Sequence, residues 1–173
     1  MDIPKYAIAE NERRCWVERV KGIDLDLPSS ALVCDLYLEG SRLRLRSVQR
    51  ADGSRQYKLC KKYATDDAFS GAIVNTYLSP EEHALLSDLP GRRIRKRRHW
   101  WQEGDNRFGV DVFEGELSGL VLCEIEKPTR EALLAVEFPS WATLEVTEDP
   151  FFRGGHLSGV SAAELADKLR SLR

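Results

Sequence analysis

The sequence predicts a mainly β (α+β) fold, built as an antiparallel barrel or sandwich. Three observations predict it. Apolar and polar residues alternate with a period of two in segment after segment, which is typical of strands. These segments follow one another at hairpin spacing, with turn signals such as Asp52–Gly53 between them. Helix-start signals are few, and no linker or repeat divides the 173 residues, so we expect one domain spanning 1–173.

Several of the expected strands have one apolar and one charged face. In the segment 41–50, for example, Arg44 and Arg46 lie on one face and Leu45 on the other. Between 72 and 78 the segment is short and β-branched. In chain order, the expected strands lie around 10–14, 41–50, 56–63, 72–78, 93–101, 108–113, 120–126 and 143–147.

Three segments carry the signals of helices. Ser79 is an N-cap residue, and Glu82 completes a capping box before a helix that ends at 90–91. Thr129 caps a second expected helix over about 129–136. A second capping box at 161–164 begins the last helix, whose apolar stripe consists of Leu165, Leu169 and Leu172.

Composition excludes several classes of protein. With 42% apolar and 31% charged residues, the chain is not disordered. A net charge of -2 and a pI near 6.0 argue against a nucleic-acid partner, despite the basic run 92–98. No run of 18 apolar residues is present, so we expect no membrane-spanning helix. The four cysteines form no C-x-x-C pair, which fits reduced thiols in a cytoplasmic protein.

The charged faces carry blocks of one sign. The ordinary interpretation places such faces in solvent over an apolar core. However, like charges on neighbouring strands repel, and exposed faces usually mix the two signs. The alternative is a closed barrel whose polar faces point inward, which would suit a polyanion and a divalent metal. The alternation by itself leaves both arrangements open.

The order of these motifs along the chain is informative. Glu10-x-Glu12-x-Arg14 is similar to an E-x-E-x-K signature. Further motifs follow in the segments 37–46, 57–62, 77–82, 96–98, 111–115, 119–126 and 145–150. The series covers nearly the whole chain and resembles the CYTH superfamily, the triphosphate tunnel metalloenzymes.

The resemblance implies a closed eight-stranded antiparallel β-barrel tunnel with a few helices packed outside. It implies a bound triphosphate and Mg²⁺ or Mn²⁺ as cofactor. By position, the catalytic residues would be Glu10, Glu12 and Arg14. The metal ligands would be Glu10, Glu12, Asp111, Glu124 and Glu126. The substrate-binding cations would be Arg44, Arg46, Lys58, Lys62, Lys96 and Arg98.

The function expected from this resemblance is metal-dependent hydrolysis of inorganic tripolyphosphate or a small organic triphosphate. A class IV-like adenylate cyclase, a thiamine triphosphatase and a non-catalytic binder of polyphosphate or nucleotide are the alternatives. Two departures motivate the last of these: Arg14 replaces the signature lysine, and 73–77 lacks the R-x-E-x-E pattern of the family. The sequence leaves a monomer and a homodimer equally open.

Overall fold

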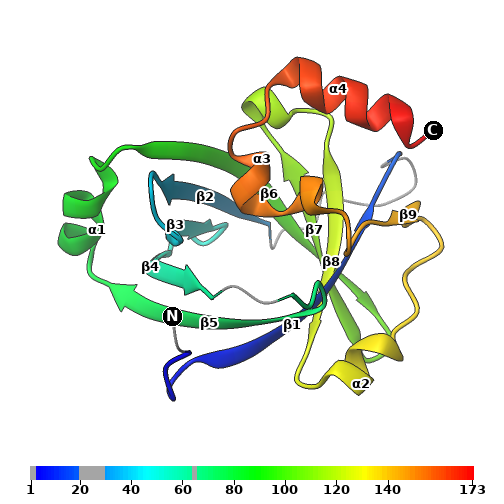
Figure 1. Ribbon diagram of the computed structural model, residues 1–173, viewed down its shortest axis with the longest axis horizontal. Coiled ribbons are helices and arrows are strands. Elements are labelled where there is room, and N and C mark those ends of the chain that lie inside the picture. Colours follow the sequence, from blue (N-terminus) through cyan, green and yellow to red (C-terminus); the bar gives the residue numbers. More distant parts are fainter. Residues whose placement is uncertain (1–2, 20–29, 64–65) are drawn as a thin grey trace.

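The computed structural model describes residues 3–19, 30–63 and 66–173. Within these residues, eight antiparallel strands close into a barrel (Figure 1). Around the barrel their order is β1-β5-β4-β3-β2-β6-β7-β8, and β8 returns to β1. The strands are β1 (Ile8–Trp16), β2 (Ala31–Leu38), β3 (Leu43–Arg50), β4 (Arg55–Lys62), β5 (Ser70–Leu78), β6 (Gly91–Glu103), β7 (Asn106–Phe113) and β8 (Val121–Lys127).

The first strand closes the barrel. One edge of β1 pairs with β5, where Ile8 lies opposite Ile73. The other edge pairs with β8, where Glu12 lies opposite Glu126. Closure leaves no unpaired sheet edge within the barrel, and it forces every second side chain of each strand into the lumen. The predicted mainly β fold with an eight-stranded barrel is confirmed.

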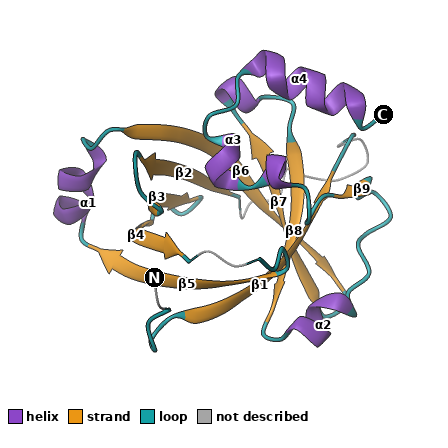
Figure 2. Ribbon diagram, in the orientation of Figure 1, coloured by secondary structure: helices purple, strands orange, loops and turns teal. Residues whose placement is uncertain are grey.

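The helices are short and lie outside the barrel (Figure 2). Both predicted capping boxes are present: Glu82 N donates to Ser79 Oγ, and Glu164 N donates to Ser161 Oγ. In chain order the remaining elements are α1 (Pro80–Ser87), η1 (Gly115–Leu117), α2 (Arg130–Leu134), β9 (Leu144–Glu145), η2 (Pro150–Phe152), α3 (Gly154–Leu157) and α4 (Ala162–Ser171).

The apolar core lies largely between the barrel wall and these outer elements. Leu36, Leu38 and Leu45 pack beneath α1, with Leu86 from that helix against them. A second cluster beneath α2 includes the fully buried Leu133 and Val110. The third and largest cluster joins the C-terminal elements to the wall through Trp16, Phe152, Leu157, Leu165 and Leu120. The outward faces of the strands are therefore apolar where helices cover them, whereas part of the third cluster, including Ile94 and Leu122, faces inward at one end of the cavity.

The structure differs from the sequence prediction at three elements. The pattern predicted no strand at 31–38, yet β2 lies there. Its outward residues Leu36 and Leu38 are buried beneath α1, and its inward residue Asp35 is buried within the barrel. A run buried on both faces shows no period of two. The strand expected at 143–147 is only the two-residue β9 beside β1. No helix was expected at 154–157, where the short helix α3 lies.

Candidate active site in the barrel lumen

The charged strand faces line the interior of the barrel. A cavity of about 470 Å³ is bounded by residues of all eight strands and by the C-terminal segment 152–157. A second cavity of about 420 Å³ adjoins it near the start of β1 and the end of β8. The two share five wall residues, so they are parts of one lumen: Glu10, Arg44, Arg46, Arg98 and Glu126.

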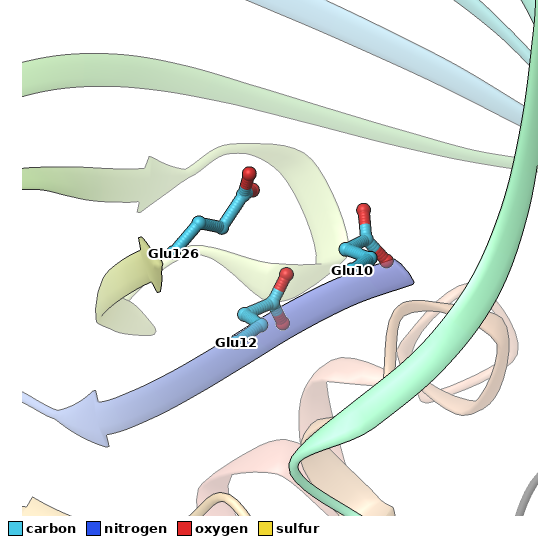
Figure 3. A group of neighbouring side chains, drawn as sticks. All are labelled: Glu10, Glu12 and Glu126. Carbon is cyan, nitrogen blue, oxygen red and sulfur yellow. The ribbon is translucent and has the colours of Figure 1, made fainter. Parts of the chain in front are cut away.

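Three carboxylates meet on one wall of this lumen. Glu10 and Glu12 come from β1, and Glu126 comes from β8, with their side chains directed toward a common space (Figure 3). One carboxylate oxygen from each lies within 4.8 Å of the others. The register places Glu12 directly opposite Glu126, an arrangement of like charges that is unfavourable without a cation. We call this group the carboxylate trio.

The electrostatics of Glu126 reflect this crowding. Partial burial raises the pKa of Glu126, and the neighbouring charges of Glu10 and Glu124 raise it further. A cation among these oxygens would relieve the repulsion and favour the charged form of the carboxyl. Carboxylate oxygens are also the ligands that Mg²⁺ and Mn²⁺ prefer. The residues present therefore fit a divalent metal.

The Glu124 carboxylate, two residues along β8, has different surroundings. Arg98 forms an ion pair with it, and Arg14 Nε lies 3.8 Å from Glu124 Oε1. Although burial opposes the charged form, Lys96, Arg98 and Arg14 hold the pKa of Glu124 well below its ordinary value. Glu124 is thus a permanent anion between cations, and it lies outside the carboxylate trio.

Asp111 is the most enclosed of the predicted metal ligands. Its side chain has no solvent exposure and is absent from the cavity lining. Arg98 donates to both of its oxygens, at 2.7 and 2.6 Å, and Lys96 Nζ also donates to it. Asp111 therefore lies behind two cations, and its contacts are those of a counter-ion. Its role as a metal ligand stays a prediction.

The opposite wall carries the predicted phosphate-binding arginines. Arg44 and Arg46 project from β3 into the lumen, and both contact Asp35 of β2. Sequence reasoning did not select Asp35, because the expected strands did not include β2. The available signal was a single acidic residue within the otherwise apolar run 31–38.

The two lysines of β4 differ from each other. Lys62 forms an ion pair with Glu10 across the lumen. Lys58, which lines the second cavity, has no carboxylate within ion-pair distance among the described residues. Burial lowers the pKa of Lys58, and the adjacent Arg46 lowers it further. An anion entering the lumen would find this cation uncompensated.

The β5 wall is poor in charge, as the departure from the family pattern predicts. Ile73 and Asn75 face the second cavity from this strand. Asn75 Oδ1 is buried and accepts no hydrogen bond from the described residues. Cys60 of β4 lies opposite Asn75 and lines the main cavity, as does Lys62 on the same face of the strand.

Comparisons with known proteins agree with this geometry. No family model matches the chain. A curated inorganic triphosphatase of Nitrosomonas europaea is 39% identical over 69 residues. The matched segment covers 39% of this chain and 46% of that protein, which is about half of its length.

Solved structures extend the likeness over the whole barrel. A crystal structure of an inorganic triphosphatase aligns with a TM-score of 0.56 and 26% identity, covering 86% of this chain and 93% of that one. These findings confirm the resemblance to the CYTH superfamily. A structure described as a candidate adenylate cyclase of Bacillus halodurans has a similar fold, with a TM-score of 0.52 and 13% identity over 74% of this chain and 85% of that one.

Among the described residues, no helix is both long and apolar enough to cross a membrane.

Proposed function

We propose that this CYTH protein is a metal-dependent triphosphatase that hydrolyses inorganic tripolyphosphate or a small organic triphosphate. One observation carries the proposal: a single closed lumen holds the carboxylate trio on one wall and phosphate-binding cations on the other walls. The likeness to inorganic triphosphatases supports the same reaction class. Charged side chains buried in the lumen without a triphosphate or metal ion to compensate them would destabilise the fold.

The carboxylate trio would hold Mg²⁺ or Mn²⁺, which when bound neutralises phosphate charge and polarises a phosphoryl oxygen. The remaining roles belong to the chain itself. Arg44 and Arg46 present planar guanidinium groups that match phosphate oxygens, and Lys58 contributes a compact charge. Phosphoryl transfer depends mainly on positioning and charge stabilisation, and rigid barrel strands supply both.

Arg14 is placed to orient the reacting end of the substrate. It projects into the cavity beside Glu12 and Glu124. An arginine cannot accept a proton, so we assign it electrostatic stabilisation and not general-base chemistry.

Phosphate release separates the candidate substrates. We expect purified protein with Mg²⁺ or Mn²⁺ to release phosphate from tripolyphosphate, and EDTA to abolish this release. ATP and thiamine triphosphate serve as the comparison substrates. Glu12→Gln should lose activity, whereas Glu148→Gln removes an exposed carboxylate outside the lumen and should not. Cyclic AMP as the sole product from ATP would overturn the proposal.

A non-catalytic triphosphate binder is the second candidate, and the ion pair between Arg14 and Glu12 favours it. This pair engages one member of the carboxylate trio. A binder would show a rise in melting temperature with tripolyphosphate but no turnover. Activity that appears only in Arg14→Lys would support the binder, and brisk turnover by the unaltered protein would exclude it.

A further inference from the structure

The buried Asp35 lies beside Arg44 and Arg46, on the wall of the lumen opposite the carboxylate trio. It projects from β2 toward the lumen, and the register places Arg46 of β3 directly opposite on one side. On the other side its neighbour is the apolar Ile94 of β6. Only 2% of the Asp35 side chain is exposed, so bulk water does not solvate this carboxylate. Its partners must therefore come from the protein.

Arg46 is the principal partner of Asp35. Arg46 Nε donates to Oδ1 at 2.6 Å, and Nη2 donates to Oδ2 at 2.7 Å. This bidentate arrangement fixes both the position and the plane of the guanidinium group. A guanidinium group has five N–H donors, and the pair uses two of them. Among the described residues, no further hydrogen bond engages the remaining donors of this oriented group.

A second guanidinium group shares the same carboxylate. Arg44 Nε lies 3.7 Å from Asp35 Oδ1 and makes no hydrogen bond to the described residues. Burial alone would raise the pKa of Asp35, but Arg46 and Arg44 together hold it well below its ordinary value. One fixed negative charge therefore compensates two buried, like-charged neighbours that would otherwise repel each other.

We propose that Asp35 is a positioning residue that orients Arg46, and with it Arg44, for phosphate binding before the substrate enters. This inference rests on the proposed triphosphatase function. Asp35 does not touch the substrate in this scheme. It acts through the arginines, because preorganised donors lose less freedom on binding than mobile ones.

Asp111 provides a parallel on the neighbouring strands. It is equally inaccessible to solvent, and it pairs with Lys96 and Arg98 in the same manner. Two buried aspartates thus stand behind two pairs of phosphate-binding candidates. The repetition of this arrangement favours a common design in which each aspartate orients the cations in front of it.

The direction of the effect of Asp35→Asn distinguishes positioning from simple charge balance. If Asp35 only reduced the net positive charge of this wall, its neutralisation would strengthen the attraction for a polyanion and tighten binding. If Asp35 positions the arginines, tripolyphosphate binding weakens although the lumen has become more positive. We expect the dissociation constant for tripolyphosphate, measured by calorimetry without metal, to rise by about tenfold. We also expect kcat with metal to fall.

Matched variants test the mechanism. Asp167→Asn removes one exposed aspartate from α4 and should leave binding and turnover unchanged. Arg46→Lys retains the charge but cannot form the bidentate pair, so it should weaken binding to a similar extent. In the double variant, Asp35→Asn should add little to Arg46→Lys, because both changes break the same contact. If Asp35→Asn fails to fold, unchanged binding in Arg46→Lys overturns the positioning role, and weaker binding in Asp35→Glu, which keeps the charge but displaces the carboxylate, supports it.

Each outcome has one meaning. Unchanged or tighter tripolyphosphate binding in Asp35→Asn, or in Arg46→Lys when only that variant folds, overturns the positioning role and leaves the triphosphatase proposal intact. Full additivity in the double variant also overturns it. If the unaltered protein neither binds nor hydrolyses tripolyphosphate, the proposed function fails and this inference fails with it.

Discussion

Arg14 Nη1 donates a hydrogen bond to the main-chain carbonyl of Phe152, at 3.1 Å. This contact joins the first strand of the barrel to the C-terminal 3-10 helix η2, 138 residues later. Arg14 also pairs with Glu12 on its own strand, so one guanidinium group bridges the cavity wall and the segment that covers its end. A lysine at this position has one donor group and cannot reproduce the planar fork.

We therefore predict that Arg14→Lys destabilises the protein. Loss of a hydrogen bond from a charged donor should lower the free energy of unfolding by about 1 kcal/mol. For a chain of this length, this corresponds to a decrease in melting temperature of roughly 2–4 °C. Thermal unfolding followed by circular dichroism provides the measurement. An unchanged melting temperature would show that the bridge to Phe152 contributes nothing to stability.

Glu126→Gln should have opposite effects on stability and activity. Burial and the nearby carboxylates raise the pKa of Glu126, so its charged form is unfavourable in the metal-free fold. A neutral glutamine removes that cost, and we expect a small rise in melting temperature at pH 7 in EDTA. The same change removes a member of the carboxylate trio and should abolish metal-dependent turnover. Near-normal turnover by this variant would contradict the metal assignment.

Glu124→Gln should destabilise the protein, in contrast to its neighbour. Its carboxylate pairs with Arg98 and lies near Arg14, and removing the charge leaves these buried cations less compensated. We expect a loss of about 2 kcal/mol in the free energy of unfolding, measured by urea denaturation at pH 7. A gain in stability would mean that Glu124 belongs with the carboxylate trio and not with the cations.

The same carboxylate should make stability depend on acid pH. Its cationic neighbours hold the pKa of Glu124 below that of the unfolded chain, about 4.3. A depressed pKa contributes stability above pH 4.3 that is lost as the pH falls below it. The decrease in melting temperature between pH 6 and pH 3 should therefore be steeper in the unaltered protein than in Glu124→Gln. Glu148→Gln should retain the steep dependence, whereas equal slopes in all three proteins would contradict the assignment.

Thiol reactivity should differ sharply among the four free cysteines. Cys15 and Cys123 face each other across β1 and β8 and are buried, and burial raises the pKa of Cys15 to about 12. Cys60 is also buried, and Cys34 is the most accessible. We expect Ellman's reagent at pH 8 to modify only Cys34 in the folded protein. Cys34→Ser should then show no rapid reaction, and fast modification of that variant would contradict this burial pattern.

The sequence determined much of the fold because successive residues of a barrel strand point alternately inward and outward, which produces an alternation of polar and apolar residues that can be recognised in the sequence. The motif order identified the carboxylates of β1 and β8 and the cations of β3, β4 and β6, and the structure places these in or directly behind one lumen. Alternation could not reveal β2, since barrel and helix cover its two faces. Asp35 was missed for the same reason.

Only the tertiary structure decided which charges meet. Glu10, Glu12 and Glu126 lie together, whereas Glu124 and Asp111 are held by cations, although all five share one motif series. The physical reason is register: strand pairing sets which residue stands across from Glu12 or Asp111, and the strand sequences alone do not contain that offset. In the same way, the register of β2 against β3 places Asp35 opposite Arg46.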